Sequence, residues 1–310
     1  MATDSTLRII QEEEATAAIG SRAATRFLAG LWALTKPEIN FLIAITVLVS
    51  FLLAHQGSHL APVFPVFNAI LGTLLVSSGA AALNQFMERR FDSRMRRTAR
   101  RPLVIGDVTP RTALLFGMTI SILGVIYLNL WANPLSSLIA GLTSVMYLAV
   151  YTPLKRITPL CTAIGAIPGA APPLIGWAAA TGTLGHGALT LYAMLFLWQF
   201  PHFMAIAWMY RDDYERAGYR VLPSFHERRL FAALQATVPS VLMIPVSLIP
   251  AIGNGAGKVY LAGAIALALG FALLSIRFAR NTTNLAARQL LFASIMYLPI
   301  ILVLLLLDRR

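Results

Sequence analysis

Long apolar stretches alternate with short polar stretches along most of the chain. Nine apolar stretches of about 18 to 22 residues follow one another, and charged residues lie almost entirely between them. A helix of about 20 apolar residues spans the hydrocarbon core of a bilayer, whereas membrane β-strands give shorter segments of alternating polarity. The pattern therefore predicts nine membrane-spanning helices, at about residues 38–55, 66–84, 113–131, 134–151, 160–180, 188–208, 232–250, 258–277 and 288–307.

The composition agrees with an all-α membrane protein. Hydrophobic residues make up 57% of the 310 residues and charged residues only 12%, with a mean hydropathy of +0.70. Soluble domains carry about 25% charged residues. We therefore expect nine helices bundled around a central cavity. The single cysteine, Cys161, excludes an internal disulfide and a metal site built on paired cysteines.

The basic residues lie mainly on one side of the predicted bundle. If the N-terminus and every second connection share one face, that face carries all 25 Lys and Arg residues except Lys258, Arg309 and Arg310. Basic loops stay on the cytosolic side of a membrane. We therefore expect the N-terminus in the cytosol and the C-terminus outside. This asymmetry accounts for the net charge of +12 without nucleic-acid binding.

Acidic and amide side chains follow the second predicted span. In NQFMERRFDSRMRRTARRP, Asn84, Glu88 and Asp92 are four residues apart, so they share one face if the helix continues. Carboxylate and amide oxygens are the ligands that Mg²⁺ takes beside water and substrate phosphate. The sequence therefore indicates a magnesium site here. A solvated helix end whose acids pair with the neighbouring arginines would have the same pattern.

Two further clusters belong to the same predicted face. QFPHFMAIAWMYRDDYERAG places His202 within the sixth span and Asp212 and Asp213 just beyond its cytosolic end. Two acidic clusters fit a pair of metal ions that grips one diphosphate. Such a site needs cations, and YTPLKR supplies Lys155 and Arg156 at the end of the fourth span. Membrane anchoring is the plainer interpretation of these cations, and hydrogen bonding between helices is the plainer interpretation of His202.

Together these segments resemble the UbiA-type intramembrane prenyltransferases and, within them, the protohaem IX farnesyltransferases, or haem O synthases. NQFMERRFDSRMRRTARRPL is similar to their first Asn-x3-Asp-x3-Asp motif with its trailing arginines. YTPLKRITPLCTAIGAIPGAAPPLIGW resembles the segment that distinguishes haem O synthases from relatives acting on quinone precursors, and WQFPHFMAIAWMYRDDYERAGYRVLP resembles their second acidic loop. The resemblance runs from TKPEI at Thr35 to the last span.

The resemblance implies a role for each matching residue. It implies Mg²⁺ ligands at Asn84, Glu88, Asp92, Asp212 and Asp213, diphosphate contacts at Arg97, Arg101, Lys155 and Arg156, catalytic roles for Tyr151, Lys155 and Asp92, and a haem contact at His202. Two positions depart from the family pattern. Glu88 stands where the family has Asp, which keeps the charge but alters the reach. The second loop reads DDYER instead of Asp-x3-Asp, which leaves open which acid binds metal.

The implied reaction joins the farnesyl group of farnesyl diphosphate to the 2-vinyl group of haem b, with addition of water, to give haem O. Mg²⁺ is the implied cofactor, haem b and farnesyl diphosphate are the substrates, and a haem A synthase is a possible further partner. The alternatives are a UbiA-type aromatic prenyltransferase of quinone biosynthesis, a transporter and a structural assembly factor. The TPLCTAIGAIPGAAPPLIGW segment argues against the first. A transporter would place acids at mid-membrane, and an assembly factor would not require two acidic clusters.

The chain is expected to divide into an N-terminal cytosolic or interfacial segment, 1–34, and a prenyltransferase domain, 35–310. RAATRFLAGLWAL predicts a short amphipathic helix at the membrane surface. The lack of an Arg- and Ser-rich leader favours a bacterial inner membrane, with the active site facing the cytosol. We expect the loops after the second and sixth spans to close over bound magnesium diphosphate.

Overall fold

The protein is a bundle of membrane helices. The computed structural model describes residues 24–55, 63–223 and 225–310, so most of the predicted N-terminal segment lies outside the described residues. In these ranges the only bridge of β type joins Ala256 to Arg309, and nine helical segments are long and apolar enough to cross a membrane. The predicted all-α class and the nine spans are therefore confirmed.

The elements follow one another as α2 (Pro37–Ala54), α3 (Val63–Asp92), α4 (Pro102–Ile105), α5 (Pro110–Trp131), α6 (Pro134–Val145), the π-helical turn η1 (Met146–Tyr151), α7 (Thr152–Leu154), α8 (Cys161–Gly169), α9 (Pro172–Thr181), α10 (His186–Met209), α11 (Arg211–Arg216), α12 (Phe225–Ile252), α13 (Lys258–Asn281) and α14 (Asn284–Leu307). Five of these helices begin at a proline, whose missing amide hydrogen is not needed in the first turn. The short α4 and α11 belong to the connections after the second and sixth spans.

Two of the nine spans are built from more than one helical piece. The fourth consists of α6, η1 and α7, and the fifth consists of α8 and α9. The break in the fifth lies at Ala170 and Ala171, directly before Pro172 and Pro173, which lack the amide hydrogens that would continue the ladder. π-helical turns are common at functional sites, and η1 ends at Tyr151, one of the predicted catalytic residues.

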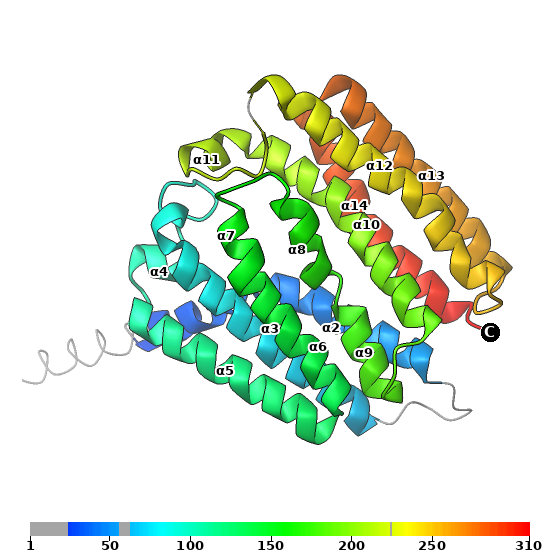
Figure 1. Cartoon of the computed structure of the whole chain (residues 1–310), viewed down its shortest axis with the longest axis horizontal. Helices are drawn as coiled ribbons and strands as arrows, with labels where there is room; N and C mark the ends of the chain where they lie inside the picture. The colour runs from blue at the N-terminus through cyan, green and yellow to red at the C-terminus, as the bar shows by residue number, and fades with distance from the viewer. Residues whose placement is uncertain (1–23, 56–62, 224) are drawn as a thin grey trace, which may run out of the picture.

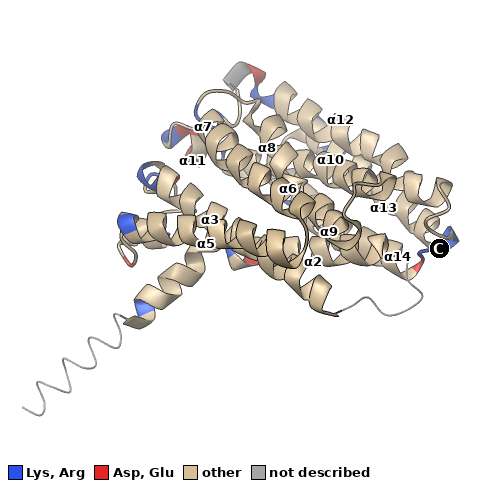
Figure 2. Cartoon of the chain, turned by 60° about the horizontal axis from the view of Figure 1, so that its bottom comes forward, with Lys and Arg blue, Asp and Glu red and all other residues tan. Residues whose placement is uncertain are grey.

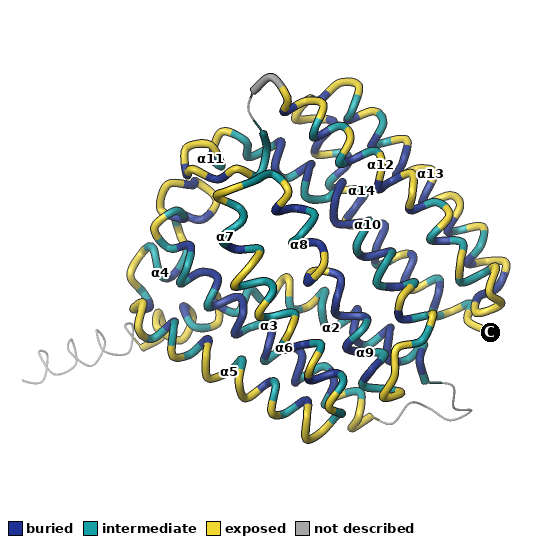
Figure 3. Tube along the Cα trace, in the orientation of Figure 1, coloured by how far each residue is buried: buried dark blue, intermediate teal, exposed yellow. Residues whose placement is uncertain are grey.

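The helices divide into two groups with α7 and α8 between them. In Figure 1, α10, α12, α13 and α14 lie together on one side, and α2, α3, α5, α6 and α9 lie on the other. Figure 3 shows buried positions concentrated where these groups face the interior, and exposed positions along the outward sides of α5, α12 and α13. Many outward side chains are large and apolar, such as Leu130 and Leu273, as expected for surfaces that contact lipid.

Glycines hold α3 close against α5. A Cβ atom added at Gly124 of α5 would lie 2.7 Å from the backbone nitrogen of Val76, and one added at Gly117 would lie 2.8 Å from Cγ of Leu83. Any larger residue at either position would therefore push the two helices apart. This close packing fixes α3, which continues eight residues past the predicted end of its span and carries the first polar cluster.

Most charged side chains gather at one end of the bundle. Figure 2 shows blue and red segments around the ends of α3 and α7, around α11 and at the start of α12. Residues 24–34 are helical and join this end through Leu34, which is fully buried among Val108, Ala113 and Ala82. The loops after the second and sixth spans thus share one end of the molecule.

Candidate active site

The extended end of α3 carries a buried polar row. Asn84, Glu88 and Asp92 are 1%, 6% and 2% exposed, and they share one face because the helix continues to Asp92. This burial contradicts the alternative interpretation of a solvated helix end. Three oxygen-bearing side chains, two of them acidic, instead face the interior at the charged end of an apolar bundle.

Two cations neutralise the carboxylates, one from the connection after α3 and one from the end of the fourth span. The Nζ atom of Lys155 lies 2.8 Å from Oε1 of Glu88, and Nη1 of Arg101 lies 2.5 Å from Oδ2 of Asp92. Arg101 also lies 3.9 Å from Oε2 of Glu88. Buried carboxylates need such partners, because an unpaired charge in a dry interior is strongly unfavourable. The structure thus brings together four of the predicted site residues.

Lys36 completes the row, and the sequence analysis missed it. Its Nζ atom donates a 2.9 Å hydrogen bond to Oδ1 of Asn84, whose own amide lies 3.2 Å from Oγ1 of Thr152. Burial lowers the pKa of the Lys36 amine. The residue adopts a left-handed backbone conformation (φ 52°) directly before Pro37, where α2 begins. In the sequence it was only one of many basic residues expected on the cytosolic side.

Tyr151 lies directly beside Lys155. The Nζ atom of Lys155 is 4.5 Å from the centre of the Tyr151 ring, which also packs against Tyr147 at 5.4 Å. The ring lies so close to Gly165 of α8 that a Cβ atom there would overlap it. A glycine is therefore required opposite Tyr151, and the aromatic face is fixed next to the cation.

The other two predicted diphosphate contacts lie apart from the carboxylates. The guanidinium of Arg97 lies 5.8 Å from the centre of the Tyr210 ring, and that of Arg156 lies 4.8 Å from the centre of the Phe91 ring. Neither makes an ion pair with Glu88 or Asp92. Arg97 and Arg156 instead lie over aromatic rings, Tyr210 at the end of α10 and Phe91 in α3.

The second acidic loop presents one buried and one exposed carboxylate. Asp213 is 7% exposed and pairs with Arg216, whereas the side chain of Asp212 is 73% exposed and lies 3.7 Å from Arg211. No group of three His, Cys, Asp or Glu residues in the described ranges is close enough to hold a metal ion. The two acidic clusters therefore share one end of the bundle without forming an assembled metal centre.

Tyr219 is a second residue that the sequence analysis missed. It is 7% exposed, packs against Phe91 of α3 at 5.7 Å, and its hydroxyl makes no hydrogen bond to any described group. Burial raises the pKa of this hydroxyl, and the negative charge of Glu88 adds to the effect. The hydroxyl is therefore a buried donor near the polar row of α3.

His202 bridges α10 and α14. Its Nδ1 atom lies 2.8 Å from Oγ of Ser294, and its ring stacks on Trp198 at 4.7 Å. Because Ser294 donates its own hydroxyl hydrogen to the carbonyl of Leu291, Nδ1 of His202 must be the donor. This tautomer leaves the Nε2 lone pair as the free acceptor of the ring. The contact between α10 and α14 therefore uses Nδ1 of His202 and does not use Nε2.

Both the fold and the polar segments have counterparts in known proteins. A profile described as the UbiA prenyltransferase family matches residues 43–297, which include both acidic loops and the segment between them. The chain belongs to the UbiA prenyltransferase family. The resemblance to UbiA-type prenyltransferases seen in the sequence is thereby confirmed. This chain is a membrane-embedded prenyltransferase.

Curated relatives within the UbiA family support a narrower grouping. The protoheme IX farnesyltransferase of Koribacter versatilis (strain Ellin345) is 43% identical over 286 residues, covering 89% of this chain and 92% of the relative. The protein of the same name from Anaeromyxobacter sp. (strain Fw109-5) is 41% identical and covers 96% and 99% of the two chains. The predicted similarity to protohaem IX farnesyltransferases is therefore confirmed.

Solved UbiA structures share the fold at low sequence identity. A digeranylgeranylglyceryl phosphate synthase superposes with a TM-score of 0.75 at 16% identity, covering 91% of this chain and 98% of that chain. A UbiA homologue from Archaeoglobus fulgidus bound to GPP and Mg²⁺ superposes with a TM-score of 0.62 at 15% identity, covering 89% and 99%. The arrangement of helices is thus that of the UbiA fold.

Proposed function

We propose that this protein transfers the farnesyl group of farnesyl diphosphate to the 2-vinyl group of haem b, with addition of water, to form haem O. The main support is the buried row of Asn84, Glu88 and Asp92, lined by cations at the charged end of an apolar bundle. The names of the curated relatives support haem as the acceptor of the prenyl group.

The polar row has the chemistry of a magnesium site. Its donors are hard oxygens from two carboxylates and one amide, and they are buried with lysine and arginine as their present partners. We assign Asn84, Glu88 and Asp92 to Mg²⁺, and from the second loop the buried Asp213 in preference to the exposed Asp212. When bound, Mg²⁺ would neutralise negative charge on the departing diphosphate.

The chain's own cations would hold the diphosphate. Lys36, Arg101 and Lys155 each lie within 2.9 Å of an oxygen of the row, so their positive charges already converge there. Arg97 and Arg156 belong to the surrounding loops, and we assign them a contact with the diphosphate once these loops close over it. Together these groups would stabilise the charge that develops as the carbon–oxygen bond breaks.

The apolar bundle and its aromatic residues would protect the farnesyl cation. A bundle interior that excludes bulk water prevents early quenching of the allylic cation before the vinyl group attacks it. The Tyr151 ring, fixed against Gly165, offers a π face beside the reaction centre. For haem, the free Nε2 atom of His202 is the nitrogen available to the iron.

We further propose that the charged end faces the cytosol of a bacterium and that the protein resides in the inner membrane. The concentration of Lys and Arg at this end supports that orientation, and the bacterial sources of the relatives support the compartment. In this arrangement a haem A synthase in the same membrane could take up the product.

The direct test uses the purified protein in detergent with haem b, farnesyl diphosphate and Mg²⁺. The extracted haem should gain the mass of one farnesyl group plus one hydroxyl group, because the water that captures the second cation releases a proton. Removal of Mg²⁺ by a chelator, and the variant Asp92→Asn, should each abolish the gain, while Asp212→Asn, which alters an exposed carboxylate, should leave most of it. A prenylated aromatic acid in place of a haem product would refute haem as the substrate and retain the prenyltransferase chemistry.

A further inference from the structure

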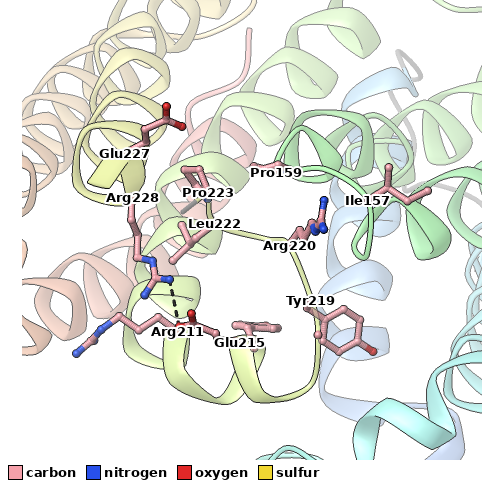
Figure 4. A pocket seen from close by; sticks show the side chains of 12 residues that line it. Ile157, Pro159, Arg211, Glu215, Tyr219, Arg220, Leu222, Pro223, Glu227 and Arg228 are labelled. Atoms are coloured by element: carbon pink, nitrogen blue, oxygen red, sulfur yellow. Dashed lines mark hydrogen bonds and ion pairs between the residues drawn. The ribbon is translucent and has the colours of Figure 1, made fainter. Parts of the chain in front are cut away.

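A pocket of about 640 Å³ opens beside the candidate active site at the charged end (Figure 4). It lies between the loop that follows α7, the helix α11 with the turn after it, and the start of α12. Its apolar wall is formed by Ile157, Pro159, Leu222 and Pro223. The pocket therefore offers apolar surface within a rim that is otherwise rich in charge.

Three arginines and two glutamates line the same pocket. Arg228 lies 3.2 Å from Glu215, so these two charges offset each other. Arg211 is held in place by hydrogen bonds to a carbonyl of α10 and to the first side chain of α14, and it lies 3.7 Å from the exposed carboxylate of Asp212. The guanidinium of Arg220 makes no hydrogen bond or ion pair within the described ranges. Glu227 is the remaining acid, so the lining carries a net positive charge.

The pocket adjoins the polar row of α3 through two consecutive residues. The backbone nitrogen of Arg220 donates a 2.7 Å hydrogen bond to the carbonyl of Lys155, the lysine that pairs with Glu88. Tyr219 lines the pocket and packs against Phe91 of α3, and in Figure 4 its hydroxyl points away from the other lining side chains. One side of this wall thus faces the pocket and the other faces the candidate active site.

We propose that this pocket binds the propionate carboxylates of haem b, with Arg220 as the main contact and Arg211 as the second. The inference rests on the proposed function, because it concerns how the acceptor is held. Haem b has an apolar ring with ionised propionates at one edge and vinyl groups on other parts of its rim. Arginine forms strong, oriented hydrogen bonds to carboxylates. A propionate edge held at the aqueous rim directs the opposite part of the ring inward, toward the buried row.

The position of the pocket also avoids the energetic cost of burying propionates. Ionised carboxylates taken into hydrocarbon without partners are strongly unfavourable, whereas an open pocket at the end of the bundle keeps them partly hydrated. The apolar wall can at the same time contact the edge of the ring. The pocket thus matches a ligand that is apolar on one side and doubly anionic on the other.

The test compares two ligands that differ only in these charges: haem b and its dimethyl ester, in which both carboxylates are methylated. Each is titrated into the purified, detergent-solubilised protein, and binding is followed by the haem absorbance. The wild-type protein should bind haem b about tenfold more tightly than the ester, because arginine donates stronger hydrogen bonds to an ionised carboxylate than to a neutral ester. Arg220→Gln should remove most of this difference and leave the affinity for the ester unchanged.

A matched control uses Arg111→Gln. Arg111 is an exposed arginine at the start of α5 that makes no hydrogen bond or ion pair in the described part of the chain. This variant should keep the full preference for haem b over the ester. Equal preference in the wild-type and Arg220→Gln proteins would overturn the proposal, as would loss of the preference in Arg111→Gln, because any surface arginine would then suffice.

Product formation separates this inference from the proposed function. With saturating haem b, Arg220→Gln should form farnesylated haem with an unchanged KM for farnesyl diphosphate. When haem b is varied at saturating farnesyl diphosphate, the variant should show an increased KM for haem b. If the wild-type protein forms no farnesylated haem, the proposed function fails. If it forms the product, but Arg220→Gln has the wild-type KM for haem b, only the pocket assignment fails.

Discussion

Replacement of Glu88 by leucine should destabilise the protein before any substrate binds. Glu88 is 6% exposed and its Oε1 atom lies 2.8 Å from Nζ of Lys155, whose side chain is only 15% exposed. Glu88→Leu removes the carboxylate and leaves the lysine charge buried without this partner. Loss of one member of a buried ion pair typically costs about 3–5 kcal/mol, so we expect a decrease of this order in the free energy of unfolding.

The double variant Glu88→Leu/Lys155→Leu distinguishes charge pairing from packing. Apolar residues can replace a buried ion pair with little loss of stability, so the double variant should regain most of the stability that Glu88→Leu loses. Equilibrium unfolding in mixed micelles with a denaturing detergent, applied to both single variants and the double variant, gives the coupling between the two residues. If the effects of the two single replacements simply add, the ion pair does not contribute to the stability of this site and the reasoning is refuted.

Three further predictions concern stability and the choice of metal ligand. Burial lowers the pKa of Lys36, so its charged form favours unfolding at neutral pH, while its hydrogen bond to Asn84 acts in the opposite sense. The stability of Lys36→Met relative to the wild-type protein should therefore fall as the pH rises toward the ordinary lysine pKa of about 10.4, measured by unfolding at several pH values. Tyr219→Phe should leave the free energy of unfolding unchanged or raise it by about 1 kcal/mol, because the lost hydroxyl is buried without a partner, whereas Tyr260→Phe should lower it by about 1 kcal/mol, because that hydroxyl donates a 2.7 Å hydrogen bond to a backbone carbonyl. Asp213→Asn should raise the Mg²⁺ concentration needed for half-maximal prenyl transfer far more than Asp212→Asn, because only Asp213 is buried.

Each of these predictions has an outcome that would contradict it. A stability difference between Lys36→Met and the wild-type protein that stays constant up to alkaline pH would mean that burial does not lower the pKa of this amine. A marked loss of stability in Tyr219→Phe would reveal a hydrogen-bond partner for its hydroxyl. An equal Mg²⁺ requirement in Asp212→Asn and Asp213→Asn would mean that burial does not identify the metal ligand of the second loop.

The sequence alone was sufficient to predict the number of membrane spans and the all-α fold class. The hydrocarbon core of a bilayer sets the length of each apolar run, so the spans could be counted directly from the chain, and nine are present in the described residues. The i, i+4, i+8 spacing of Asn84, Glu88 and Asp92 likewise predicted a shared face, because helical geometry is local. The structure extended the helix to Asp92 and thereby met the condition on which that prediction depended.

Only the tertiary structure decided which cation pairs with which acid. Lys36, Arg101 and Lys155 are far apart in the sequence, and bundle packing brings them to one row. Arg97 and Arg101 look equivalent in a run of arginines, yet one contacts a tyrosine ring and the other contacts Asp92. Local spacing fixes the face of a helix on which a side chain lies. The partner across that face depends on how the other helices pack, which spacing within one segment does not encode.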